Sequence, residues 1–123
     1  MRPRRHAQET RRKMARIMDE LCNALFLAGA SKMDMSVERL EEGYRLRIQS
    51  DYSAHSRHHV EKLGVLLCPE ERNPALVEAY WELAGGDQYT SDSELSLVGH
   101  MLDEAAVVVD DAGVQMDLLI RYH

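Results

Sequence analysis

The sequence has few of the residues that mark the common specialised classes of protein. It contains two cysteines, Cys22 and Cys68, which lie far apart and form no CxxC pair or zinc-ligand spacing, so neither a disulfide scaffold nor a zinc finger is expected. No apolar run approaches the roughly 20 residues that span a bilayer, and no signal-peptide core follows the basic start. We therefore expect a cytoplasmic protein without a membrane partner. The motifs GxSxG, GxxxxGK and GxGxxG are also missing, which removes the usual signatures of hydrolases and nucleotide-binding loops.

The charged residues are distributed unevenly along the chain. Residues 1–16 hold seven basic residues and Glu9, a net charge of +6, whereas residues 17–123 hold 8 basic and 20 acidic residues, a net charge of −12. We expect residues 1–8 to form a flexible basic arm on an acidic body. Such an arm binds nucleic acid or an acidic protein surface. Because the arm has no aromatic residue to stack on bases, a protein partner or a homodimer is the stronger prediction.

The spacing of apolar residues predicts one domain over residues 1–123. The length fits a single domain, and a hydrophobic content of 45% is enough for a core. From Glu9 to Ala28 the apolar residues recur at three- and four-residue steps, which is typical of an amphipathic helix that ends at Gly29. The stripe comprises Met14, Ile17, Met18, Leu21 and Leu25. We predict this stripe as the contact of a homodimer, because it adjoins the basic arm.

Two hairpins and three further helices are predicted in the rest of the chain. Alternating runs at 33–38 and 44–49 flank the turn Glu41-Glu42-Gly43, and runs at 105–109 and 114–122 flank the turn Asp110-Asp111-Ala112-Gly113. Helices are predicted at 54–67, from Pro74 to the pair Gly85-Gly86, and at 93–102. This order predicts an α+β two-layer sandwich, with a mostly antiparallel sheet of about four strands covered on one face by helices.

The first predicted helix carries a further pattern. The segment Asp19-Glu20-Leu21-Cys22-Asn23-Ala24 places an acid four residues before an asparagine, and a strand pair follows. In this layout, and in the final helix and hairpin, most of the chain resembles the GHKL ATPases, the fold of histidine-kinase catalytic domains and anti-sigma-factor kinases. The resemblance implies the histidine-kinase-like ATPase fold. It also implies Asn23 as the residue for Mg²⁺, Asp51 as the residue for the adenine amino group and Asp19 as a catalytic base.

Both glycine motifs of that family are changed in this chain. The family's Asp-x-Gly-x-Gly is replaced by Asp51-Tyr52-Ser53-Ala54-His55, and its Gly-x-Gly-Leu-Gly-Leu by Asp92-Ser93-Glu94-Leu95-Ser96-Leu97. Phosphate sites need open backbone amides, which glycine provides. A carboxylate about 4 Å from a phosphate charge repels it by roughly 4 kcal/mol at an effective dielectric of about 20. The changes predict that ordinary ATP binding is lost.

We therefore expect a degenerate, non-catalytic member of this superfamily that needs no cofactor and acts as a regulatory protein–protein interaction module. The alternative is a surviving protein kinase of the anti-sigma-factor type, with ATP and Mg²⁺ as cofactors. A second alternative is a metal-binding or pH-sensing module built from His55, His58 and His59, which lie close together on one predicted helix. Since this segment has no HExxH pattern, solvated histidines are the simpler interpretation.

Overall fold

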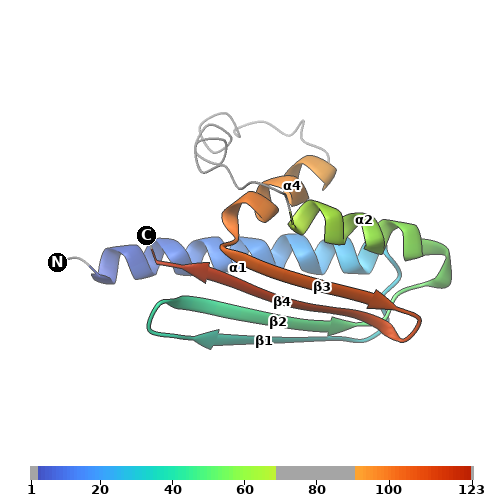
Figure 1. Ribbon diagram of the computed structural model, residues 1–123, viewed down its shortest axis with the longest axis horizontal. Helices are drawn as coiled ribbons and strands as arrows, with labels where there is room; N and C mark the ends of the chain where they lie inside the picture. The colour runs from blue at the N-terminus through green and yellow to red at the C-terminus, as the bar shows by residue number, and fades with distance from the viewer. Residues whose placement is uncertain (1–2, 69–90, 123) are drawn as a thin grey trace.

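The computed structural model describes residues 3–68 and 91–122, which form helices packed on one face of a four-stranded sheet (Figure 1). This arrangement confirms the predicted α+β class and the two layers. The elements, in chain order, are α1 (Pro3–Leu27), β1 (Met33–Arg39), β2 (Gly43–Ser50), η1 (Ala54–Ser56), α2 (Arg57–Leu67), α4 (Ser91–Met101), β3 (Glu104–Asp110) and β4 (Gly113–Arg121).

The sheet is antiparallel, with strand order β1-β2-β4-β3. Both predicted hairpins are present, because β1 pairs with β2 and β3 pairs with β4. The last strand, β4, lies beside β2 and so joins the two hairpins into one sheet. This leaves β1 and β3 as the edge strands of the described sheet.

The helix α1 supplies much of the core. Four residues of its apolar stripe are at most 3% exposed: Met14, Ile17, Leu21 and Leu25. They share one cluster with inward-facing residues of β2 and β4 such as Leu46 and Leu118, and Met18 packs against it half-buried. The stripe that the sequence predicts as the homodimer contact thus lies inside a single chain, because the sheet needs this apolar face to cover its own. Its four buried residues therefore leave little of the stripe at the surface of the chain.

The start of α1 differs from the sequence prediction, whereas its end lies close to the predicted one. The helix begins at Pro3, whereas the sequence predicts a flexible arm over residues 1–8 and a helix from Glu9. It ends at Leu27, and Gly29, which the sequence predicts as its terminator, has a φ of +86°, a conformation that glycine adopts without steric cost. The amide of Ala30 then donates to the carbonyl of Leu25 at 3.0 Å, which closes the end of the helix.

Two shorter helices complete the helical layer. The helix α2 buries three residues at the predicted spacing: Val60, Leu63 and Leu67. The helix α4 begins at Ser91, slightly before the predicted start, and crosses α2 closely at Gly99, where an added Cβ would lie 2.1 Å from the carbonyl oxygen of Leu66. The helix predicted from Pro74 lies outside the described residues.

Candidate functional site

The resemblance places a nucleotide near Asp51, which follows the end of β2. Here the Asp51 carboxylate accepts hydrogen bonds from the amides of Ser31, at 2.7 Å, and Lys32, at 3.0 Å. The Ser31 hydroxyl donates a third bond to it. These bonds lower the pKa of Asp51, chiefly through the Ser31 hydroxyl and then through the two amides, because each one favours the charged form. Asp51 is therefore ionised at neutral pH, and both of its oxygens bond to the turn that leads into β1.

Ser53, at the first changed glycine position, packs on the end of α1. Its amide donates to the carbonyl of Ala28 at 2.9 Å. An added Cβ on Gly29 would lie 2.7 Å from the Ser53 Cβ, so the two segments touch with no space between them. The Ser53 hydroxyl also lies 3.1 Å from Nδ1 of His55, the residue at the second changed position. The loop after Asp51 is thus closed onto the chain itself.

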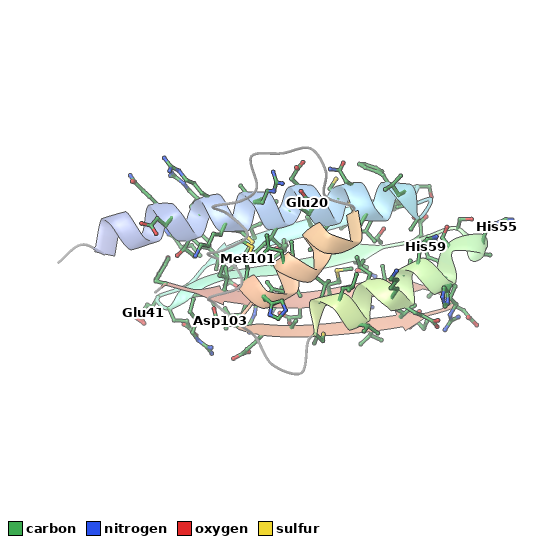
Figure 2. All side chains as sticks on the ribbon, turned by 90° about the horizontal axis from the view of Figure 1, so that it is seen from above. Glu20, Glu41, His55, His59, Met101 and Asp103 are labelled. Atoms are coloured by element: carbon green, nitrogen blue, oxygen red, sulfur yellow. The ribbon has the colours of Figure 1, made fainter. Side chains whose placement is uncertain are left out.

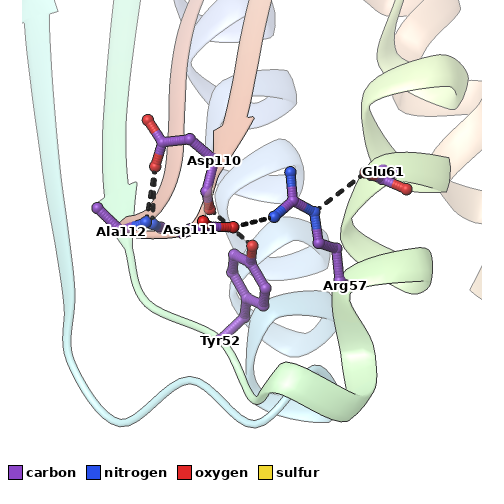
Figure 3. Close-up of polar contacts among 7 residues, drawn as sticks. Tyr52, Arg57, Glu61, Asp110, Asp111 and Ala112 are labelled. Atoms are coloured by element: carbon purple, nitrogen blue, oxygen red, sulfur yellow. Dashed lines mark hydrogen bonds and ion pairs between the residues drawn. The ribbon is translucent and has the colours of Figure 1, made fainter.

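A second set of polar contacts holds this loop to the turn between β3 and β4 (Figure 3). The Tyr52 hydroxyl donates to the carbonyl of Asp110 at 2.6 Å. The Arg57 guanidinium donates to Glu61 at 3.2 Å and forms an ion pair with Asp111. Its pKa is raised, first by the bond to Glu61 and then by the bond to Asp111. These contacts hold Tyr52, Arg57 and Asp111 within the chain, beside a polar hollow of about 360 Å³ that Asp51 and Asp110 help to line.

An apolar groove with a volume of about 350 Å³ lies between α1 and α2. It is lined by Ala24, Leu27 and Ala28 of α1, by His59, Val60, Lys62, Leu63 and Leu66 of α2, and by Leu95 of α4. Two of the described lining residues, His59 and Lys62, have polar side chains. The described lining therefore offers a bound nucleotide neither a carboxylate for adenine nor an amide side chain for a metal ion.

The residues that the resemblance assigns to one nucleotide are not gathered around this groove. Asp19 and Asn23 are exposed on α1, and neither they nor Asp51 line the groove. The second changed glycine motif falls within α4, whose residues Leu95 and Leu97 are 6% exposed. A helix stands where the resemblance implies a phosphate loop.

The three histidines of the alternative metal site are also spread apart. His55 lies in η1 and is exposed, whereas His59 faces the space between α1 and α2 (Figure 2). His58 is exposed in the first turn of α2. Within residues 3–68 and 91–122 there is no group of three or more His, Cys, Asp or Glu side chains that could hold a metal ion.

Several of the contacts at this site were not predicted from the sequence. The partners of Asp51, namely Ser31 and Lys32, lie about twenty positions away, and Asp111 is 54 positions from Arg57. The turn containing Asp111 is evident in the sequence, but its cationic partner is not, because no local spacing connects the two residues. The acid-to-asparagine spacing identified Asn23, which the structure leaves exposed.

Comparison with protein-family models, curated proteins and solved structures finds no match for this chain. In the described part of the chain, no helix has both the length and the apolar character that crossing a membrane requires.

Proposed function

We propose that this protein is a non-catalytic, histidine-kinase-like regulatory module that works by binding another protein. The observation that carries the proposal is the state of Asp51. Its carboxylate would receive the adenine amino group in the resembled family, but here Ser31 and Lys32 donate to both of its oxygens. An adenine amino group would have to compete with these three donors for the lone pairs of the carboxylate, and any amide that it displaced would lose its acceptor.

The closed loop adds to this argument. Ser53 fills the space against Gly29. The ion pair between Arg57 and Asp111 holds the start of α2, which follows the loop, against the β3–β4 turn. The described lining of the adjacent groove is mostly apolar, with His59 and Lys62 as its polar side chains, and it has no carboxylate for an adenine amino group.

A role in binding protein is supported by apolar side chains on the surface. Leu27 is 75% exposed, Val65 is 72% exposed and Phe26 is 61% exposed, all on α1 and α2. Burial of such side chains against a partner is favourable at roughly 25 cal/mol per Å². We place the protein in the cytoplasm, because Cys22 and Cys68 are both free thiols.

Isothermal titration of the protein with ATP and Mg²⁺, repeated with ADP, tests the proposal. We expect no binding heat up to millimolar nucleotide. Binding at micromolar affinity would overturn the proposal and favour the kinase alternative. In that case Asp51→Asn should abolish the heat, while Asp34→Asn, a change to an exposed carboxylate on β1, should leave it unaltered.

A further inference from the structure

The described sheet has two edge strands, β1 and β3, and the hydrogen-bond register determines which of their backbone groups face away from the sheet. The amide of Leu40 donates to the carbonyl of Gly43 at 2.7 Å. In an antiparallel ladder the bonds alternate, so the odd-numbered residues of β2 bond to β1 and the even-numbered ones to β4. By the same alternation the odd-numbered residues of β4 bond to the even-numbered residues of β3. The residues that direct their N–H and C=O groups away from β4 are therefore Ala105, Val107 and Val109.

Two contacts agree with this assignment. The amide of Tyr122 donates to the carbonyl of Glu42 at 2.9 Å, which continues the even-numbered pairing of β2 with β4. The Cys68 thiol lies 3.6 Å from the carbonyl oxygen of Ala105, on the side of β3 that faces away from β4. In the described part of the chain, no strand pairs with β3 on that side.

The two edge strands differ in the way they meet solvent. The edge strand β1 carries three exposed charged residues, Asp34, Glu38 and Arg39, and such charges are a common protection against pairing with another strand. In contrast, β3 has the sequence Glu-Ala-Ala-Val-Val-Val-Asp. Its five central residues are uncharged, and Val108 is 56% exposed. A β-branched, uncharged edge with open backbone groups is the surface onto which a further strand adds.

We propose that the free edge of β3 binds an extended segment of a partner protein as a fifth strand, with apolar β-branched residues at its centre and basic residues at its ends. This inference rests on the proposed function, since it names the surface by which the module binds protein. The backbone groups of Val107 and Val109 supply the hydrogen bonds, and the exposed Val108 packs against the side chain opposite it.

The basic ends follow from the charges that flank this edge. Acidic residues stand at both ends of this strand, with Glu104 at its start and Asp110 and Asp111 at its end. Two guanidinium groups offset them, since Arg121 pairs with Glu104 at 2.6 Å and Arg57 pairs with Asp111. These three carboxylates outnumber the two guanidinium groups, and they stand on a body whose net charge over residues 17–123 is −12. Basic residues at both ends of an incoming strand complement it.

The same charges argue against a second copy of this chain as the occupant. Antiparallel self-pairing along the whole strand centres on Val107, and it places Glu104 opposite Asp110 at both ends. Like charges directly opposite each other destabilise a strand pair. A different protein is therefore the better partner.

The test uses the full chain and a fluorescein-labelled peptide, Lys-Val-Thr-Val-Thr-Val-Lys, in fluorescence polarisation at low salt. The matched peptide has glutamate in place of both lysines. We expect saturable binding of the lysine peptide, and binding of the glutamate peptide weaker by at least about tenfold.

Two proline variants locate the site. Val107→Pro removes an N–H that faces the free edge and keeps the ladder to β4, because proline is tolerated where its N–H would face solvent. Val37→Pro makes the same change on the β1 edge, where by the same alternation the odd-numbered residues face outward. We expect Val107→Pro to weaken binding of the lysine peptide at least about tenfold, and Val37→Pro to leave it unaltered. Circular dichroism establishes that each variant is folded.

If Val107→Pro does not fold, Val108→Lys and Val37→Lys serve as the pair, because both positions are exposed and only the former places a charge on β3. Failure of the lysine peptide to bind, equal affinity for both peptides, or equal loss in the β1 variant would overturn the assignment to β3. A dimeric mass in light scattering that is lost in Val107→Pro would also overturn it, since a second copy would then occupy the edge. The nucleotide titration decides the proposed function separately, so the two failures are distinguishable.

Discussion

The charged groups of Asp51 and Arg57 are bonded within the chain, whereas along the β3 edge the backbone polar groups face outward. The carboxylate of Asp51 is bonded to Ser31 and Lys32, and the Arg57 guanidinium is bonded to Glu61 and Asp111. In contrast, the N–H and C=O groups of Val107 and Val109 point away from their one neighbouring strand. The comparison teaches that a polar residue that matches a binding motif need not indicate binding, since its partners decide what it can do.

The largest effect should come from breaking the core that supports both regions. Leu21→Asp places a carboxylate at a position that is 0% exposed, and we expect it to destabilise the fold by about 4 kcal/mol or more, enough to unfold a small domain. Urea denaturation followed by circular dichroism measures this. The control is Phe26→Asp on the same helix, at a side chain that is 61% exposed. A Leu21→Asp protein that stays folded and changes only its mass would restore the stripe as a dimer contact.

The next effect should come from forcing the Asp51 loop away from α1. Gly29→Ala meets both a φ of +86° and a contact of 2.7 Å with the Ser53 Cβ, so we expect a loss of about 1–2 kcal/mol in the free energy of unfolding. The positive φ should cost less free energy in Gly29→Asn than in Gly29→Ala, because asparagine adopts positive φ more readily. Thermal and urea unfolding of the two variants test this. Equal stability of Gly29→Ala and the wild type would mean that the loop is not packed on α1.

A smaller effect concerns acid stability. The ordinary pKa of an aspartate is 3.8, and in the folded protein the pKa of Asp51 is lower. The charged carboxylate therefore contributes its full stabilisation above the ordinary pKa. This stabilisation is lost as the pH falls through the lower pKa of the folded state. We expect Asp51→Asn to flatten the pH dependence of the unfolding midpoint in this acid range. Asp34→Asn is the control.

The Ser31 hydroxyl can be tested in the same range. Since its bond is the largest cause of the lowered pKa, Ser31→Ala should move the pKa of Asp51 back toward its ordinary value. Carbon-detected NMR titration of the carboxyl group measures this shift. An unchanged pKa would show that the hydroxyl does not bond to Asp51 in solution.

The smallest effect should come from Asp111→Ala, which removes the exposed ion pair with Arg57. Exposed pairs contribute little to stability because water and salt screen them. We expect a change in the unfolding midpoint well below that of Gly29→Ala, and a further decrease of the effect at high salt. A large change would mean that the ion pair between Arg57 and the β3–β4 turn contributes much of the stability of the fold.

The sequence predicted the elements much better than the site. Both hairpins and the buried faces of α1 and α2 follow from local periodicity, because each apolar face must be covered by another element. The same periodicity cannot say what covers the face, which is why the stripe of Leu21 and Leu25 was assigned to a dimer contact although it belongs to the core. The fate of Asp51 depends on Ser31 and Lys32, which the fold brings to it from another turn. The open edge of β3 depends on strand order, which alternation within each strand does not determine.

The most direct test of the account is an amide-resolved NMR titration of the protein with ATP and Mg²⁺ and, separately, with the lysine-ended peptide. We predict that millimolar nucleotide leaves the Ser31 and Lys32 amides unmoved, because both already donate to Asp51. We predict that the peptide shifts the amides of Ala105, Val107 and Val109. Saturable shifts of the Ser31 and Lys32 amides at micromolar ATP would contradict the account, since the Asp51 end would then be a working nucleotide site.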